Sequence, residues 1–353
     1  MDYRSLGTSG LNVPVMGLGT ANFRGGANPA HGVGDKAAAR LVDVAIERGA
    51  AFFDSADIYF PAEELLGKSL GKRRSQVLIS TKVGLRCGPG PNDVGATRHH
   101  LIEACENSLR RLGTDYIDLF QLHSFDGRTP VEETLAALDG LIRAGKIRYI
   151  GCSNYAGWQL MKALAASDRH GWPRFVAHQI ALSLAVRDAE WELVPLGADQ
   201  NVASMIWGPL AGGALAGRFG RAGEPLSNMA YPYPGLSALP QAQFLDIADC
   251  IGEVARETEA TPAQVALAWL LRRPTVATVI TGVSSAEQLE TNLDALELRL
   301  TGDQYARLDE VSARPPAFPH VLQRSFGSER IPLPQASGNV RVDRALPGVG
   351  GAE

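Results

Sequence analysis

Four polar residues that could act together on a proton follow short apolar runs in the first third of the chain. Asp54 and Tyr59 come after AAFF, whereas Lys82 follows QVLIST and His123 follows YIDLFQL. The carboxyl ends of parallel strands meet at one edge of a sheet, so these side chains converge if the runs are adjacent parallel strands. A carboxylate, a phenol, an ammonium and an imidazole in one place suit general acid catalysis. The sequence therefore favours an enzyme.

The composition is that of a globular chain with little net charge. Of 353 residues, 45% are hydrophobic and 20% are charged, and the net charge is -4, so no attraction to nucleic acid is expected. The opening segment MDYRSLGTSG lacks a basic stretch followed by an apolar one. No later run is long enough to span a bilayer. We therefore expect a cytoplasmic protein with a small-molecule substrate and no membrane partner.

The cysteines show no spacing that is typical of a disulfide framework or a zinc site. They are scattered without a CxxC pair or a Cys/His pattern: Cys87, Cys105, Cys152 and Cys250. Disulfide frameworks and zinc sites that can be recognised from sequence have regularly spaced ligands. The sequence therefore predicts reduced structural thiols and no metal.

Short apolar runs alternate with helical stretches, which is the pattern of βα units around a parallel sheet. The strand candidates are eight: 13–19, 50–54, 76–81, 116–121, 147–151, 175–180, 202–207 and 276–281. Their content of Val, Ile and Leu with little alternation indicates strands covered on both faces. An Ala-rich helix is expected from Asp35 to Gly49. Thr129-Pro130-Val131-Glu132 and Thr261-Pro262-Ala263-Gln264 both have the pattern of a capping box with proline at the first helical position.

Eight such units favour a closed (β/α)8 TIM barrel over an open doubly wound sheet. The doubly wound alternative lacks its best signal, because Gly17 and Gly19 form only GxG, with no third glycine and no helix start. We interpret these glycines as residues of a tight strand exit. Barrels of this kind often reach this length as one unit, so a single barrel domain is predicted over residues 1–333.

Three stretches fall outside the repeat. Residues 1–12, with Gly7 and Gly10 as turn residues, are expected to form a hairpin that closes the barrel floor. Residues 213–240 form a loop after strand seven that is too long for a plain connection, so it is expected to contribute to binding. Residues 334–353 are small, polar and rich in Pro and Gly, and a mobile tail is expected there.

Six motifs together resemble those of the aldo-keto reductases, most of all the aryl-alcohol dehydrogenase-like and potassium-channel β-subunit-like members. They are FFDSADIY, ISTKV, LGTDYIDLFQLH, TPVEETLAALDGLIRAGKIRYIGCSN, IWGPLAGGALAGR and TPAQVALAWLLRRP. The resemblance runs from about residue 3 to residue 312, with the motifs in the order of the family. Any one of them could arise by chance, whereas all six in order are specific.

The resemblance implies a role for each of the four polar residues. In the family a tyrosine donates a proton to the substrate carbonyl oxygen while a nicotinamide delivers hydride to the carbon, and Tyr59 would be that tyrosine. Lys82 would stabilise the phenolate, Asp54 would pair with the ammonium, and His123 would orient the carbonyl oxygen. Taken singly, each residue has an ordinary structural alternative, such as packing or a turn. His123 is the member most easily explained as a core residue.

The resemblance also implies residues that hold NADP(H), with NAD(H) accepted as well. Those expected at the nicotinamide end are Ser153, Asn154, Gln179, Trp207, Gly208, Pro209 and Leu210. Those expected at the phosphates and the adenosine are Arg218, Gly282, Ser284, Gln288 and Asn292. Amide and hydroxyl groups would bind the nicotinamide carboxamide, an indole ring would stack on the nicotinamide, and a guanidinium and a helix amino terminus suit phosphate.

Some of these residues have an equally ordinary alternative. Trp207 could serve only to pack the barrel. Ser285-Ala286-Glu287-Gln288 has the pattern of an ordinary capping box, so Gln288 could be a cap rather than a cofactor ligand. Arg187 also matches a family position, but no chemical role follows for it from the sequence.

A departure after the tyrosine bears on substrate size. Phe60-Pro61-Ala62 stands where relatives have Gly and a short polar turn, which places a bulky ring near Tyr59. With Trp207, Tyr231 and Tyr233 this ring could form the wall of an apolar pocket for an aromatic or bulky carbonyl. The alternative is that the two loop tyrosines only pack the loop against the barrel.

A second departure bears on the cofactor. Residues 281–292 contain no Lys or Arg to pair with a 2′-phosphate, so weak discrimination between NADPH and NADH is expected. Overall the sequence predicts an NAD(P)-dependent oxidoreductase that reduces an aldehyde or ketone reversibly. One alternative is a nicotinamide-binding regulatory or scaffold protein of the channel β-subunit type. Another is a barrel hydrolase that uses the carboxylates of Asp54 and Asp57.

Overall fold

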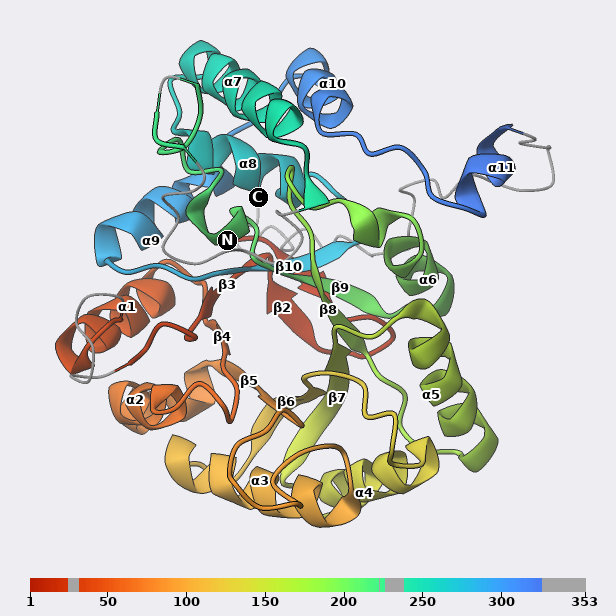
Figure 1. The fold of residues 1–353 in the computed structure, drawn as a ribbon. Coiled ribbons are helices and arrows are strands. Elements are labelled where there is room, and N and C mark those ends of the chain that lie inside the picture. The colour runs from red at the N-terminus through yellow and green to blue at the C-terminus, as the bar shows by residue number, and fades with distance from the viewer. Residues whose placement is uncertain (25–31, 222, 226–237, 326–353) are drawn as a thin grey trace, which may run out of the picture.

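Eight parallel strands close into a barrel, and helices surround it (Figure 1). The computed structural model describes residues 1–24, 32–221, 223–225 and 238–325. Around the barrel the strand order is β10-β3-β4-β5-β6-β7-β8-β9. The strands are β3 (Met16–Gly19), β4 (Phe52–Asp54), β5 (Leu78–Val83), β6 (Ile117–Leu122), β7 (Ile147–Ser153), β8 (Ala177–Ala181), β9 (Ala203–Trp207) and β10 (Val276–Thr281). The predicted single (β/α)8 TIM barrel is confirmed.

The helices follow the strands along the chain, as the βα repeat requires. Their bounds are α1 (Asp35–Glu47), α2 (Ala62–Leu70), α3 (Arg98–Leu112), α4 (Val131–Arg143), α5 (Gly157–His170), α6 (Leu193–Gln200), α7 (Gln241–Glu257), α8 (Pro262–Leu271), α9 (Ala286–Leu293), α10 (Gly302–Val311) and α11 (His320–Ser325). No helix of the described residues is both long and apolar enough to cross a bilayer.

A hairpin closes the floor of the barrel, as predicted for residues 1–12. β1 (Tyr3–Ser5) pairs antiparallel with β2 (Asn12–Pro14). Leu6, at the end of the hairpin, is fully buried among the inward side chains of the barrel strands. At Gly7 the backbone has φ +60°, and a Cβ there would lie 2.3 Å from the carbonyl oxygen of Val176. Only glycine permits this close approach to the start of β8.

The first predicted strand, 13–19, is two strands in the structure, with β2 in the hairpin and β3 in the barrel. Gly17 lies inside β3 and Gly19 is its last residue, so the interpretation as a strand exit is wrong for Gly17 and fits Gly19. A Cβ on Gly17 would lie 2.7 Å from the carbonyl oxygen of Phe52. Gly17 therefore allows β3 to approach the neighbouring β4 closely.

The main core fills the space between the barrel and its helices. In α1 the side chains of Leu41, Val42 and Ala45 are fully buried and share one face, because residues three or four apart align on a helix. Each buried Leu or Val contributes roughly 1.5–3 kcal/mol relative to an exposed one. This packing fixes the strands, and their carboxyl ends carry the polar residues.

Of the two predicted capping boxes, one is present and one is not. Thr261 caps α8 by accepting from the backbone N–H of Gln264. α4 instead begins at Val131 with Pro130 as its N-cap, and no side chain caps it. The hydroxyl of Thr129 donates to Asp126 Oδ2 at 2.6 Å. A nearby carboxylate therefore engages this hydroxyl, and the box predicted at Thr129 is wrong.

Candidate functional site

A cavity of about 830 Å³ opens at the carboxyl ends of the barrel strands. It extends from the ends of β4 and β6 to the amino terminus of α9. Of the sequence-predicted site residues, those that line it are Asp54, Tyr59, His123, Ser153, Asn154, Gln179, Trp207, Gly208, Pro209, Leu210, Gly282, Gln288 and Asn292. These residues come from segments far apart in the chain, and the barrel brings them into one cavity.

Lys82 lies beneath this cavity, almost out of contact with solvent. Its side chain comes from β5 and is 1% exposed, and Nζ lies 2.5 Å from Asp54 Oδ2. Nζ also donates to the carbonyl oxygen of Ser55 at 2.9 Å. β4 and β5 are neighbours in register, with Asp54 opposite Ser80, so the pair follows from adjacent strands. A buried ammonium thus has a carboxylate and a carbonyl as partners.

Tyr59 stands between this ion pair and His123. Lys82 Nζ lies 5.3 Å from the centre of the Tyr59 ring. On the other side, the rings of Tyr59 and His123 meet edge to face with centroids 5.7 Å apart. The phenol lies five residues beyond Asp54, on the loop that follows β4. The structure therefore brings all four predicted catalytic residues together.

Electrostatics set the charge states of the two bases. Burial disfavours charge on Lys82, but Asp54 and then Tyr59 outweigh it and raise the pKa of Lys82 above its ordinary value. Burial, with the Lys82 charge adding to it, lowers the pKa of His123 to about 3. At neutral pH the site therefore holds a charged lysine and a neutral histidine.

Two glutamines fix Asp54 from the far side. Gln179 Nε2 donates to Asp54 Oδ1 at 2.8 Å, and Gln121 Nε2 donates to the same oxygen at 3.4 Å. Gln121 also donates to Ser80 Oγ at 2.7 Å. The sequence reasoning missed Gln121, although its place at the end of an apolar strand, two residues before His123, was a usable signal. Gln179 was expected at the cofactor and also orients the carboxylate.

The predicted nicotinamide residues are hydrogen-bonded to one another. Asn154 has φ +57°. Its amide donates to the carbonyl oxygen of His123 and accepts from Trp207 Nε1, both at 3.1 Å. Ser153 Oγ donates to the carbonyl oxygen of Gln179 at 3.0 Å. Asn154 thus ties the ends of β6, β7 and β9 together, and its amide already has protein partners.

The far end of the cavity is the turn before α9. Ser285 caps this helix by accepting from the N–H of Gln288, while Gln288 Oε1 accepts from the N–H of Ser284 at 2.8 Å. The capping interpretation of Gln288 is therefore present, and Gln288 also lines the cavity. Asn292 is buried and lines it as well. Ser284 is exposed and is not among the lining residues.

Two predicted residues lie apart from the cavity wall. The guanidinium of Arg218 is exposed and pairs with Glu224 at 2.9 Å. Phe60 is 66% exposed and borders a second, smaller cavity instead. Its ring is therefore not part of the wall that was expected beside Tyr59. Tyr231 and Tyr233 lie outside the described residues.

Several lining residues were not found from the sequence. They are Gly19, Thr20, Ala21, Asn22, Gly212, Thr261 and Ala263, with apolar residues of β10. Gly213 and Ala216 also line the cavity and fall within the loop 213–240 that was expected to contribute to binding, and Glu287 and Thr291 fall within the segment 282–292 that was expected at the adenosine. Thr20, Ala21 and Asn22 directly follow β3, so their position after a strand was an available signal. Among the described lining residues there is no Lys or Arg. Where α9 borders the cavity, the charged side chain among the lining residues is the carboxylate of Glu287.

Asp57 does not share the cavity with Asp54. It is 7% exposed, and burial followed by the charge of Glu63 raises its pKa to about 7. Asp57 borders the second cavity, whereas Asp54 borders the first and is held by Lys82. A hydrolase with a carboxylate pair requires both groups to flank one bond. This arrangement disfavours the hydrolase alternative.

Comparisons with known proteins agree with one another. The Aldo/keto reductase family model matches residues 15–313. A Bacillus subtilis protein named uncharacterized oxidoreductase YrpG is 35% identical over 330 residues, which cover 89% of this chain and 97% of the relative. A probable voltage-gated potassium channel subunit beta from Arabidopsis thaliana is 33% identical, covering 84% and 92%. The versiconal hemiacetal acetate reductase of Aspergillus parasiticus is 31% identical, covering 88% and 96%.

Proposed function

This chain belongs to the aldo/keto reductase family, and we propose that it reduces an aldehyde or ketone to an alcohol, reversibly, with Tyr59 as the proton donor. The observation that carries the proposal is the buried Lys82–Asp54 pair beneath a phenol that lines the cavity. An ammonium without a substrate-facing partner would serve little purpose there, whereas beneath Tyr59 it stabilises the negative charge left by proton transfer.

When bound in the cavity, a nicotinamide cofactor would supply a hydride to the carbonyl carbon and would itself be oxidised. The hydroxyl of Tyr59 supplies the proton that the carbonyl oxygen needs, and the products are the alcohol and a phenolate held beside Lys82. Asp54 keeps the ammonium in place, and Gln179 and Gln121 keep Asp54 in place. When the reaction runs as an alcohol oxidation, Tyr59 takes the proton back. The same residues therefore serve both directions.

His123 acts as a neutral hydrogen-bond donor in this scheme. With its pKa lowered to about 3 by burial and by Lys82, one ring nitrogen keeps its hydrogen and the other has none. The N–H can hold the carbonyl oxygen next to the phenol without competing as an acid. A donor already in place for the oxygen that gains charge lowers the barrier.

The cavity fits NADP(H), and NAD(H) as well. Polar side chains of Ser153 and Gln179 stand at the catalytic end with the ring of Trp207. At Gly213 and Gly282 a Cβ would meet no atom within 4 Å, so bare backbone borders the cavity where phosphates can approach. The amino terminus of α9 lies at the far end, and the dipole of a helix favours phosphate at its amino terminus. The hydroxyl of Ser285 and the side-chain amides of Gln288 and Asn292, at the start of α9 and within it, suit an adenosine.

We propose an aromatic or bulky carbonyl as the substrate. The ring of Trp207 lines the cavity together with the apolar side chains of Leu210, Ile280 and Val283. Apolar side chains beside a polar base favour a large apolar substrate over a small sugar. One relative, 31% identical, is named versiconal hemiacetal acetate reductase, so a chain similar to this one is named as a reductase of an organic compound.

The test is turnover by the purified chain with NADPH and with NADH over a panel of aromatic, alicyclic and sugar carbonyls. We expect cofactor oxidation that depends on the carbonyl and fastest kcat/KM with a bulky cyclic one. A clear preference for a short aldose would contradict the substrate class. No turnover with any carbonyl, in either direction, would contradict the reductase itself.

A second candidate is a nicotinamide-binding regulatory subunit, because relatives with about a third of their residues identical are named as channel subunits beta. The same preparation decides between the two candidates. Quenching of protein fluorescence by NADPH without any carbonyl-dependent oxidation would favour the regulatory subunit. Quenching together with turnover favours the reductase.

A further inference from the structure

A second cavity, of about 340 Å³, lies behind the loop that carries Tyr59. Three side chains with metal-binding atoms meet there: Asp57 from the loop after β4, Cys87 from the loop after β5, and His100 from the first turn of α3. Their ligand atoms all lie within 4.8 Å of one another. None of these atoms takes part in the proposed reaction.

Two of the three side chains are buried with unsatisfied polar atoms. Asp57 is 7% exposed and His100 is 3% exposed. Among the described residues neither carboxylate oxygen of Asp57, nor Nε2 of His100, has a hydrogen-bond partner. Leaving such atoms unpaired costs on the order of 1–3 kcal/mol each. Unpaired buried atoms of this kind therefore indicate a place where a ligand can bind. The thiol of Cys87 is exposed and makes only a 3.5 Å contact with the carbonyl oxygen of Asp93.

The neighbouring charges do not satisfy these atoms. Glu63 is committed elsewhere, since its carboxylate accepts from Thr81 at 2.5 Å and from Arg111 at 2.7 Å. Asp93 Oδ2 accepts from the N–H of Gly90 at 2.6 Å. Arg111 borders the cavity but donates to Glu63. The three side chains are therefore left facing a space that has room for an ion.

We propose that Asp57, Cys87 and His100 bind a zinc ion, with a fourth position open to water. Carboxylate oxygen, thiolate sulfur and imidazole nitrogen are together a zinc donor set, whereas calcium and magnesium prefer oxygen alone. Three protein ligands and an open position are a common zinc arrangement. Zinc bonds of about 2.0–2.3 Å require donor atoms roughly 3.3–3.8 Å apart, so the three ligand atoms, which lie within 4.8 Å of one another, would draw together on binding.

Such an ion would fix the segment that positions Tyr59. Asp57 lies two residues before Tyr59, and its backbone N–H donates to the carbonyl oxygen of Lys82 at 2.9 Å. Zinc would join this segment to α3 and to the loop after β5. The site is independent of the proposed function, because its ligands lie outside the catalytic cavity. It also departs from the sequence-based expectation of no metal.

The first experiment is a zinc titration of the full chain after treatment with a chelator. We expect one Zn²⁺ per chain and a higher melting temperature with zinc than without it. Co²⁺ in place of zinc should show a thiolate-to-metal absorption band. Cys87→Ser and His100→Gln should each weaken zinc binding by at least about tenfold, since even outer neighbours of metal sites have effects of that size. Cys250→Ser is the matched control and should bind as the unaltered chain does.

The second experiment needs no substitution. Cys87 is exposed and Cys250 is half-buried, so iodoacetamide should alkylate Cys87 faster in the metal-free chain. Zinc should slow alkylation of Cys87 by at least about tenfold and leave Cys250 unchanged, as read by peptide mass spectrometry. The proposal is overturned if zinc does not protect Cys87, if Co²⁺ gives no thiolate band, or if the two ligand variants bind zinc as tightly as the Cys250→Ser control.

Discussion

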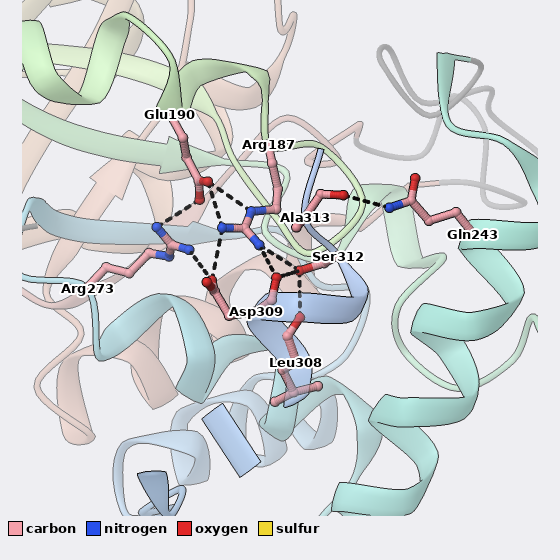
Figure 2. Close-up of polar contacts among 8 residues, drawn as sticks. All are labelled: Arg187, Glu190, Gln243, Arg273, Leu308, Asp309, Ser312 and Ala313. Carbon is pink, nitrogen blue, oxygen red and sulfur yellow. Dashed lines mark hydrogen bonds and ion pairs between the residues drawn. The ribbon is translucent and has the colours of Figure 1, made fainter. Parts of the chain in front are cut away.

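Among the residues that the structure describes, two cationic side chains are buried, and they differ in what surrounds them. Lys82 is 1% exposed and Arg187 is 7% exposed. Arg187 follows β8, and its guanidinium is enclosed by the carboxylates of Glu190 and Asp309 and by the hydroxyl of Ser312 (Figure 2). Lys82 has the single carboxylate of Asp54 and lies beneath a cavity.

The Arg187 network joins segments that are far apart in the chain. Arg273, at the end of α8, pairs with Glu190 at 2.8 Å and with Asp309 at 3.0 Å. Figure 2 shows both guanidinium groups sharing these two carboxylates. The ring of Trp269 lies under both guanidinium groups. Its centre is 4.0 Å from Cζ of Arg273 and 5.2 Å from Cζ of Arg187. The network therefore fastens α8 and α10 to the loop after β8, which gives Arg187 the structural role that its sequence did not reveal.

Burial of a charge therefore does not by itself indicate function. Around Arg187 the planar fork meets acceptors on each side, as guanidinium groups do in structural ion pairs. Around Lys82 the phenol of Tyr59 stands between the ammonium and the cavity. A buried cation is a functional candidate when a group that can change its protonation lies between it and open space.

The largest effect is expected at the catalytic cation. Lys82→Met should lower kcat by roughly a hundredfold to ten-thousandfold, because the charge that stabilises the phenolate is lost. Asp54 then has no cation, so the measurement includes a melting curve and NADPH binding by fluorescence. Turnover within a few-fold of the unaltered chain would remove Lys82 from the mechanism. Lys162→Met, on the exposed side of α5, is a control that should change neither kcat nor the melting temperature nor NADPH binding.

The structural cation should show the opposite pattern. Arg187→Met should lower the free energy of unfolding by about 1.5–3 kcal/mol, because the half-buried carboxylate of Glu190 and the hydroxyl of Ser312 lose a charged hydrogen-bond donor. Per folded molecule kcat should stay within about twofold, since the network lies outside the cavity. Urea unfolding measures the free energy of unfolding, and turnover at equal active-site concentration measures kcat. Arg40→Met, at an exposed ion pair of 3.9 Å, should cost no more than about 1 kcal/mol.

If Arg187→Met lowers kcat as much as Lys82→Met does while the chain remains folded, the distinction between the two cations fails. Loss of both stability and activity in the same proportion would not contradict it.

The same contrast extends to two buried histidines. His178 Nε2 accepts from the N–H of Tyr155 at 3.1 Å, and burial lowers the pKa of His178 to about 4. Below the ordinary histidine pKa of about 6.5 the unfolded chain takes up a proton that the folded chain refuses, so stability falls as pH drops from about 6.5 to about 4. When the pH falls from 7 to 4.5, the free energy of unfolding should therefore drop less in His178→Gln than in the unaltered chain. The difference should be on the order of 2–3 kcal/mol.

Urea unfolding at the two pH values measures this difference, with turnover at pH 7 expected to be unchanged. In the site, His123→Gln should instead lower kcat, because His123 lines the cavity. An equal loss of stability on acidification in His178→Gln and in the unaltered chain would contradict a neutral His178.

The smallest effect is expected where the described cavity wall has no cation. Glu287 lines the cavity near α9, and Glu287→Lys would place an ammonium where a 2′-phosphate is expected. A hydrogen bond to a charged group contributes about 1.5–3 kcal/mol, so the ratio of kcat/KM for NADPH over NADH should rise roughly tenfold or more. The unaltered chain should accept both. A ratio that does not change would place the 2′-phosphate elsewhere.

Much of the fold follows from local sequence. Each barrel strand is a continuous apolar run, so its existence could be predicted, and β10 was placed at 276–281 as observed. Wrong predictions arose where two neighbouring segments share one apolar run, or where two groups compete for one hydrogen bond. In the run 13–19, one strand ends at Pro14 and the next strand begins two residues later. The hydroxyl of Thr129 bonds to Asp126 rather than to the helix.

The candidate site could be predicted in part, because Asp54, Tyr59, Lys82 and His123 lie at or just beyond the carboxyl ends of strands. Residues that act through pairings across the barrel were less visible. Gln121 and Arg187 acquire partners only when distant segments meet, and the same holds for the three ligands of the proposed zinc site. Their spacing along the chain carries no pattern, so only the fold could bring them together.

The most direct test of the central claim is the rate of carbonyl reduction by Tyr59→Phe. This change keeps the ring, its edge-to-face contact with His123 and the Lys82–Asp54 pair, and it removes only the hydroxyl. The account predicts that kcat falls by roughly a hundredfold to ten-thousandfold while NADPH affinity and melting temperature stay nearly unchanged. A folded Tyr59→Phe chain that reduces the same carbonyl within a few-fold of the unaltered rate would contradict it.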